Sequence, residues 1–317
     1  EPDVAVAQVT PMDGNGFFNL STSCSMTPAY LRKAKKVVVE VNTNTPRCLG
    51  GQDEAIHISR VDMVVEGPNS PLIQLPGTVA SEVDTQIARH VMALLEDGST
   101  IQLGIGALPN MVGAMIAQSD LKDLGVHTEM LADSYVDMYE AGRITGRRKS
   151  IDHEKMVYTF AMGSQKLYDF LDNNPVAAIF PASYTNDPCV IGRNQKVVAI
   201  NNAIEIDLFT QVASEASGAR QISGTGGQLD FILGAYKSEG GKGLICVNST
   251  YKKKDGTLAS RIVPTLSPGT IVTCPRSLVH YVVTEFGCAQ MKAKSTWQRA
   301  EALINIAHPD FRDQLIL

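Results

Sequence analysis

Glu129 is a carboxylate placed where this sequence could do chemistry. It lies within residues 125–133, where an apolar strand should give way to the next element. In open α/β sheets, ligands bind beside the carboxyl ends of the strands, so a carboxylate there is a candidate site residue. By itself the position favours an ordinary loop charge, or a helix-start residue stabilised by the helix dipole. The neighbouring His127 fits a hydrogen-bonding loop histidine better than a base.

A second candidate is the glycine-rich segment at residues 223–231, which leads into a helical pattern. Gly224, Gly226 and Gly227 fall within four residues of one another. Such a run exposes backbone N–H groups, the geometry of an anion nest or an oxyanion hole. A flexible turn would have the same composition, so both interpretations stay open.

A third segment combines an expected strand at 100–103 with the turn Gly104-Ile105-Gly106 and a following apolar helix. This arrangement points N–H groups and a helix N-terminus at whatever occupies the turn. The third glycine of a dinucleotide fingerprint is absent, as is its distant acidic residue. The turn therefore indicates either a tight connection or one wall of a ligand cleft.

Polar residues between apolar strands form a fourth group, which includes Asn186, Glu205 and Asp207. Buried polar groups need partners, so these side chains are expected to be hydrogen-bonded. Glu205 and Asp207 could form a carboxylate pair or a metal site. The favoured interpretation is that they bond to loops and fix a cleft.

Composition narrows the class of protein. The chain has 317 residues, 44% hydrophobic and 19% charged, with a formal charge of −5. This length predicts two domains, and the charge offers no basic face for nucleic acid. No apolar run approaches the roughly 18 residues that span a bilayer. The six cysteines form no CxxC pair, which argues against disulfides or structural zinc and favours a reducing cytoplasm.

Short apolar strands alternate with helical patterns, which predicts an α/β protein with a largely parallel sheet. A helix is expected at 82–95, capped by Ser81. Prolines and glycines at 67–77 mark a boundary between domains 1–76 and 77–317. A domain seldom begins inside its own sheet, so the apparently buried strand at 4–9 suggests that an upstream segment is missing. Further strands are expected at 37–41, 63–66, 100–103, 177–180, 197–200, 243–247, 271–273 and 281–284.

Taken in order, these segments resemble the acetyl-CoA hydrolase/transferase family, and specifically its 4-hydroxybutyrate CoA-transferase branch. The resemblance covers nearly the whole chain. Motifs that carry it include Asp13-Gly14-Asn15-Gly16, Leu103-Gly104-Ile105-Gly106, His127-Thr128-Glu129-Met130, Thr185-Asn186-Asp187-Pro188, Gly224-Thr225-Gly226-Gly227-Gln228-Leu229-Asp230-Phe231 and His280-Tyr281-Val282-Val283-Thr284-Glu285-Phe286-Gly287.

The resemblance implies two similar open α/β domains of the CoA-transferase type with a CoA cleft between them, the first domain truncated at its N-terminus. Glu129 falls on the family's nucleophilic glutamate. Gly226 and Gly227 fall on its oxyanion loop, and Asn186 on a polar residue near the reacting carbonyl. Residues expected to contact CoA are Gly104, Ile105, Gly106, Gln228 and Lys252, with Lys253, Lys254 and Lys242 as further phosphate candidates.

The implied reaction moves CoA between a short-chain acyl-CoA (4-hydroxybutyryl, butyryl or acetyl) and a carboxylate such as acetate. It would be a ping-pong reaction through a glutamyl-CoA thioester on Glu129. CoA is then a co-substrate, with no metal and no permanently bound cofactor expected. Family members are commonly homodimers or dimers of dimers. The alternatives are an acyl-CoA hydrolase and, from another class, a CoA- or nucleotide-binding regulatory module in which Glu129 is inert.

Overall fold

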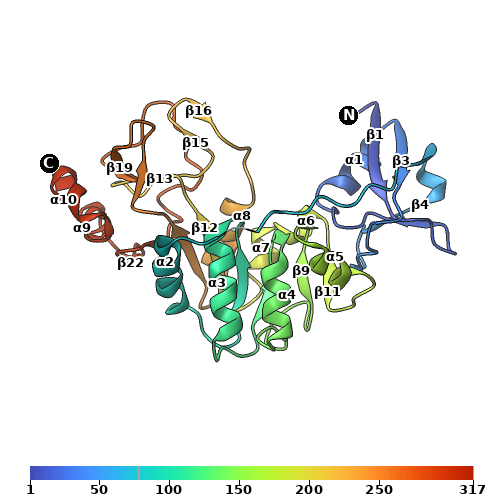
Figure 1. The fold of residues 1–317 in the computed structure, drawn as a ribbon, viewed down its shortest axis with the longest axis horizontal. Helices are drawn as coiled ribbons and strands as arrows, with labels where there is room; N and C mark the ends of the chain where they lie inside the picture. Colours follow the sequence, from blue (N-terminus) through green and yellow to red (C-terminus); the bar gives the residue numbers. More distant parts are fainter. Residues whose placement is uncertain (78, 317) are drawn as a thin grey trace.

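Two sheets organise the chain along its longest axis (Figure 1). The computed structural model describes residues 1–77 and 79–316. Residues 1–66, here called the N-terminal unit, lie at one end of that axis, and helices α9 (Thr296–Ile306) and α10 (Pro309–Ile316) lie at the other. Between them stands a large sheet, called the main sheet, with helices on both faces. The chain is thus a mixed α/β fold with parallel sheets, as predicted.

The N-terminal unit is built on three parallel strands in the order β1-β3-β5, namely Val4–Val9, Lys36–Val41 and Met63–Glu66. β1 was expected to be buried, but it is an edge strand. Ala5, Ala7 and Val9 point into the core, whereas Val4 and Val6 are exposed. This alternation is what a strand with one covered face requires. Helix α1 (Thr27–Lys33), the 3₁₀ turn η1 (Ile58–Arg60) and the hairpin β2 (Phe17–Asn19) with β4 (Ala55–His57) complete the unit.

Eight of the described strands form the main sheet, in the order β11-β9-β7-β6-β12-β17-β21-β22. All neighbours are parallel except the last pair. The bounds in that order are Ala177–Ile179, Met156–Tyr158, Gly125–His127, Thr100–Leu103, Val197–Asn202, Lys242–Cys246, Tyr281–Thr284 and Gly287–Gln290.

The main sheet is apolar on both faces, as the continuous runs of β-branched residues predict. In β12, Val198 and Ile200 pack into a cluster with helices α2 (Glu82–Met92), α3 (Ala107–Gln118) and α4 (Asp133–Glu140). Val197 and Ala199 pack into a second cluster, with α8 (Gln228–Lys237) and α9. Because successive side chains of a strand point to opposite faces of the sheet, alternate residues of β12 pack against helices on both sides.

The predicted helix after Ser81 is confirmed, because the Ser81 hydroxyl accepts from the Asp84 N–H and a complete capping box is formed. Its regular part ends at Met92 rather than at residue 95. The predicted strand at 271–273 is wrong. Ile271 and Val272 are exposed, and the segment makes only an isolated bridge at Cys274 to Val212.

Short elements cover the carboxyl edge of the main sheet. Three of them are strand pairs: β8 (Met130–Leu131) with β10 (Phe160–Ala161), β15 (Ala216–Ser217) with β16 (Arg220–Gln221), and β18 (Thr250–Lys252) with β19 (Leu258–Ser260). A small three-stranded sheet has the order β14 (Val212–Ala213), β13 (Glu205–Asp207) and β20 (Ile262–Val263). The remaining helices are α5 (Gln165–Leu171), α6 (Ala182–Thr185) and α7 (Pro188–Ile191).

The strand order reverses between β6 and β12. From β6 the chain adds β7, β9 and β11 on one side, and from β12 it adds β17 and β21 on the other. At such a switch point the two connections leave in opposite directions and open a crevice outside the strand ends. The turn at Gly104 follows β6, and Glu129 follows the neighbouring β7. The topology therefore brings the predicted segments to one edge.

The N-terminal unit reaches the same edge through residues 22–25. Ser23 bridges to Phe160 and Ser25 to Pro181, and the Ser25 N–H donates to the Thr159 carbonyl. Between β5 and α2 the described residues form no helix or strand, and this connection crosses from the unit to α2 (Figure 1). No helix within residues 1–77 and 79–316 has the length and apolar character to cross a membrane.

Candidate active site

The carboxylate of Glu129 is held by two hydrogen-bond donors from distant parts of the chain. The Asn186 side-chain amide donates to Oε1 at 3.0 Å. The backbone N–H of Gly227 donates to Oε2, also at 3.0 Å. The Glu129 backbone is fixed as well, since its carbonyl accepts from the N–H groups of Thr159 and Phe160. Glu129 is half-buried, so it is oriented by the fold yet accessible.

Asn186 is positioned by His127, which lies two residues before Glu129 in the sequence. His127 is fully buried in β7, and its Nε2 lies 2.9 Å from the Thr185 carbonyl at the end of α6. Burial lowers the pKa of His127 to about 3, assisted by the charge of Lys149. The ring is therefore neutral at physiological pH, and its Nε2–H donates to Thr185. His127 acts as a structural donor, as the sequence interpretation held, but it lies in strand β7 and not in a loop.

Gly227 is a glycine because nothing larger fits. A Cβ built there would lie 2.6 Å from the Asn186 amide nitrogen and 2.7 Å from Glu129 Oε2. Gly227 is also the N-cap of α8, a helix without a side-chain cap. The helix therefore starts with its positive end beside the carboxylate, which favours negative charge there. The Gly227 N–H thus points at the Glu129 carboxylate, while the oxyanion-type role expected of this loop stays a prediction.

Gly226 stands further away than its neighbour. Its ideal Cβ would meet Glu129 Oε2 at 4.0 Å, an ordinary contact. The structure thus brings both predicted loop glycines to Glu129, but gives the close approach and the hydrogen bond to Gly227.

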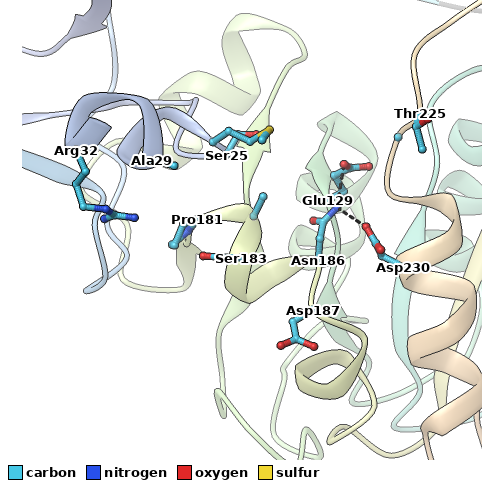
Figure 2. A pocket seen from close by; sticks show the side chains of 13 residues that line it. Ser25, Ala29, Arg32, Glu129, Pro181, Ser183, Asn186, Asp187, Thr225 and Asp230 are labelled. Atoms are coloured by element: carbon cyan, nitrogen blue, oxygen red, sulfur yellow. Dashed lines mark hydrogen bonds between the residues drawn. The ribbon is translucent and has the colours of Figure 1, made fainter. Parts of the chain in front are cut away.

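Asp230 is an acidic neighbour of Glu129, and the sequence patterns did not single it out as a site residue. Its Oδ2 lies 3.5 Å from the Asn186 amide nitrogen, so this amide faces two carboxylates (Figure 2). Burial raises the pKa of Asp230, the Asn186 hydrogen bond opposes that shift, and the charges of Glu129 and Asp187 add to it. The position of Asp230 in the first turn of α8, two residues after the predicted segment's Gln228, was the available signal.

Two cavities meet at Glu129. The larger, of about 540 Å³, runs between α1 and α6 and is lined on one side by Met26, Ala29 and Arg32 of the N-terminal unit. Figure 2 shows Arg32 facing Glu129 and Asn186 across this space. Pro181 and Ala182 supply apolar surface on the other side. No pattern in the sequence indicated that α1 would contribute to the site.

The smaller cavity, of about 340 Å³, occupies the switch point of the main sheet. Gly104 and Ile105 line it, as does Gln228, whose Nε2 donates to the Asn202 carbonyl at 3.2 Å. Gly106 stands next in the chain as the N-cap of α3, with a φ of 118° that favours glycine. Further lining residues are Gln102, Met130, Asn201, Glu215 and Thr273.

The basic residues considered for CoA phosphates lie elsewhere. Lys242 begins β17, at the amino edge of the main sheet, and its Nζ bonds Glu96 at 2.6 Å and the Leu94 carbonyl. That edge is opposite Glu129, so Lys242 was a wrong candidate. Lys252 is exposed on the β18–β19 hairpin and lines neither cavity beside Glu129. Its contact with CoA stays a prediction, as do those of Lys253 and Lys254.

Asp207 fixes a loop, as the favoured interpretation held. Its carboxylate accepts from the Gln211 N–H at 2.8 Å and from the Gln211 amide at 2.7 Å. Burial raises the pKa of Glu205 above its ordinary value, and the positive charge of Arg261 opposes part of that rise. Among the residues that the structure describes, no three His, Cys, Asp or Glu side chains are grouped to hold a metal ion.

An oriented carboxylate with donors beside it, at a switch point between two cavities, suits covalent acyl transfer. Two family descriptions match the chain: the acetyl-CoA hydrolase/transferase N-terminal domain over residues 2–76 and its C-terminal domain over residues 163–317. The butyryl-CoA:acetate CoA-transferase of Anaerostipes caccae is 55% identical over 99% of this chain and 71% of its own length.

The 4-hydroxybutyrate coenzyme A transferase of Clostridium kluyveri is 44% identical over 99% of this chain and 71% of its own. The crystal structure of RipA from Yersinia pestis superimposes with a TM-score of 0.91 at 42% identity, covering 99% of this chain and 69% of that one. The chain therefore belongs to the acetyl-CoA hydrolase/transferase family, as one of its CoA-transferases.

Proposed function

We propose that this protein moves CoA between a short-chain acyl-CoA and a carboxylate acceptor such as acetate, by a ping-pong mechanism through Glu129. The observation that carries the proposal is the Glu129 carboxylate, fixed by Asn186 and Gly227 and open to two cavities. A carboxylate is a weak nucleophile, so its reactivity must come from placement and from stabilisation of the tetrahedral oxyanion.

The proposed reaction has two covalent steps in each half. A Glu129 oxygen attacks the thioester carbonyl, and the carbon–sulfur bond breaks. CoA leaves as a thiolate, and the acyl group stays on Glu129 as a mixed anhydride. The thiolate then attacks the glutamyl carbonyl, which releases the first acid and leaves a glutamyl-CoA thioester. A second carboxylate reverses both steps, so no proton is gained or lost and no general base is needed. This agrees with a neutral His127 that is committed to Thr185.

The two donors have distinct roles in this scheme. The Gly227 N–H would donate to the oxyanion that develops on the glutamyl carbonyl, as it now donates to Oε2. The Asn186 amide would orient the other oxygen for attack. Loss of one such donor typically costs a factor of about 10²–10³ in kcat.

The two cavities fit two parts of the substrate. The smaller cavity contains buried polar atoms without partners among the described residues, Ser214 Oγ and Gln228 Oε1, which match the amide-rich arm of CoA. The larger cavity offers the apolar surfaces of Met26, Ala29 and Pro181 to a short acyl chain. Butyryl, 4-hydroxybutyryl and acetyl groups are the proposed range, in line with the names of the similar enzymes.

Trapping the covalent intermediate tests the proposal. Full-length protein incubated with butyryl-CoA and no acceptor is treated with borohydride, which reduces a glutamyl thioester to an alcohol, and the modified peptide is mapped by mass spectrometry. We expect reduction at Glu129, none in Glu129→Gln, and unchanged labelling in Glu140→Gln, an exposed control on α4. Labelling of another residue would assign the nucleophile elsewhere and contradict the proposal, and labelling of none would favour a binding module.

Acetate titration separates a transferase from a hydrolase. A transferase forms acetyl-CoA in proportion to acetate and releases little free CoA without it. Release of CoA at a rate that ignores acetate would identify a hydrolase acting through the same residue.

Two further proposals concern organisation. We place a first CoA-transferase domain at 1–76 and a second at 77–317, divided within the segment between Glu66 and Glu82, whose described residues form no helix or strand. We also expect a homodimer or a dimer of dimers, which light scattering after size-exclusion chromatography can measure.

A further inference from the structure

The loop that carries Gly226 and Gly227 is tied to one buried residue, Glu215. The backbone carbonyl of Glu215 accepts from the N–H groups of Ile222 and Ser223, at 2.8 and 3.2 Å. Its side-chain Oε2 accepts from the Thr225 hydroxyl at 2.9 Å. A single residue therefore holds both the beginning and the middle of the segment that ends at Gly227.

Glu215 is itself held in a rigid setting. It is 5% exposed, and its Oε1 accepts from the Thr273 hydroxyl at 3.2 Å. The Thr273 oxygen in turn accepts from the Ser214 N–H at 2.9 Å, and the Thr273 N–H donates to the Val212 carbonyl. The irregular segment that the sequence presented as a strand thus serves as the anchor for this carboxylate.

The loop has little packing of its own. Residues 220–226 are exposed, and a Cβ at Gly224 would meet no described atom within 4 Å. With so few neighbours, hydrogen bonds must fix the loop, because exposed glycines lose much conformational entropy when they are ordered. The Thr225–Glu215 bond is the last side-chain tether before Gly227, whose N–H must stay 3.0 Å from Glu129 Oε2.

We propose that Glu215 is a positioning residue for the reaction: through Thr225 it holds the Gly226-Gly227 loop against Glu129. This inference rests on the proposed acyl transfer at Glu129. A carboxylate suits the position because its two oxygens can accept from two hydroxyl groups at once, and bonds to a charged acceptor are the stronger kind. Glutamine at this position keeps an oxygen for Thr225, whereas alanine leaves the hydroxyl without its partner.

A double-mutant cycle on acylation tests the inference. Borohydride-quenched time courses give the rate of Glu129 labelling by butyryl-CoA in wild type, Glu215→Ala, Thr225→Val and the double variant. We expect each single change to slow labelling by about 10- to 100-fold, and the double to be no slower than the slower single, because both remove one interaction. KM for butyryl-CoA should change less than kcat, and Glu215→Gln should stay within about threefold of wild type.

Thr257→Val is the matched control. Its hydroxyl also donates to a carboxylate, Asp255 at 2.7 Å, but on the exposed β18–β19 turn. We expect its labelling rate to equal that of wild type. Should Glu215→Ala fail to fold, Thr225→Val carries the test, since it is nearly isosteric and lies on an exposed loop.

The outcomes distinguish this inference from the proposed function. Absence of labelling in wild type overturns both. Normal labelling in wild type with unchanged rates in Glu215→Ala and Thr225→Val overturns the positioning role alone. Additive losses in the double variant would also contradict it, because they would mean that the two residues act separately.

Discussion

The Gly227 N–H and the Glu129 carboxylate are 98 positions apart in sequence and 3.0 Å apart in space. The approach is so close that a Cβ on residue 227 would lie 2.7 Å from Oε2 and 2.9 Å from Cδ of Glu129. The neighbouring Gly226 has no such restriction, since its nearest contact would be 4.0 Å. Two adjacent glycines of one loop therefore carry different constraints, and this difference can be measured.

Gly227→Ala is expected to lower kcat by about 10²–10³-fold, the usual loss of one oxyanion donor. The added methyl would displace either the Glu129 carboxylate or the Asn186 amide, so the donor and the nucleophile would no longer meet. Gly226→Ala is the matched control and should stay within about tenfold of wild type. Steady-state kinetics with butyryl-CoA and acetate measure both. Equal losses in the two variants would mean that loop flexibility, not the approach to Glu129, is what matters.

Asn186→Ala is expected to lower kcat by about 10- to 100-fold, the worth of a hydrogen bond to a charged group. It removes the donor to Oε1 and leaves Asp230 facing Glu129 without the amide between them. Asn186→Asp should lower kcat further, because it places a third carboxylate beside those of Glu129 and Asp230. The control is Asn305→Ala, on an exposed position of α9. A raised KM with an unchanged kcat would instead assign Asn186 to substrate binding.

Local patterns were enough to predict most of the sheet. β6 and β21 of the main sheet lie where runs of β-branched residues placed them, because a strand buried on both faces must be apolar along its length. β3 and β5 of the N-terminal unit also lie where they were predicted, although β5 is exposed along its length. The segment at 271–273 has the same composition but follows Ser-Pro-Gly, and its backbone is used to anchor Val212. Composition alone cannot separate these two uses.

The site was predictable only where a motif carried it. Glu129 and Gly227 come from the ordered motifs, since no spacing rule joins residues 98 apart. The Thr225–Glu215 tether and the contribution of Arg32 arise from tertiary packing between separate elements, so neither leaves a periodic trace in the sequence. Lys242 failed as a candidate for the opposite reason: its charge was visible, but the edge of the sheet on which it would lie was not.

His127 gives the protein an acid sensitivity whose sign follows from its burial. Its pKa is lowered from 6.5 to about 3 in the folded protein, so between these pH values His127 is protonated in the unfolded chain and neutral in the folded chain. The stability from this residue is therefore present above about pH 6.5 and lost toward pH 3, at about 1.4 kcal/mol per pH unit. His127→Phe removes this dependence and also costs about 1–3 kcal/mol at pH 7, because Thr185 loses its donor.

Urea unfolding at pH 4, 5 and 7 measures the effect as a difference between variants. The deficit of His127→Phe should shrink as the pH falls. His153→Gln, at an exposed position, serves as the control and should follow wild type. A deficit that stays constant with pH would mean that His127 is protonated in the folded protein.

Lys149 should destabilise the fold most at neutral and acid pH. Its side chain is 1% exposed, passes against Gly125, and ends with Nζ donating to the Lys155 carbonyl at 2.8 Å. Burial lowers its pKa from 10.5 to about 7. The folded state thus prefers the neutral amine, and the unfolded state gains a proton below pH 10.5. Stability is lost as the pH falls from 10.5 to 7 and stays at the lower level below that.

Lys149→Met keeps the length of the side chain and removes the charge. We expect it to raise the free energy of unfolding by about 2–4 kcal/mol at pH 6, somewhat less than the full linkage because the Lys155 carbonyl loses a donor. The gain should fade by pH 10, where wild-type Lys149 is neutral at little cost. Urea titrations followed by circular dichroism at pH 6, 8 and 10 measure it, with the exposed Lys254→Met as the control. A gain that is equal at pH 6 and pH 10 would come from packing and would contradict the titration of a buried amine.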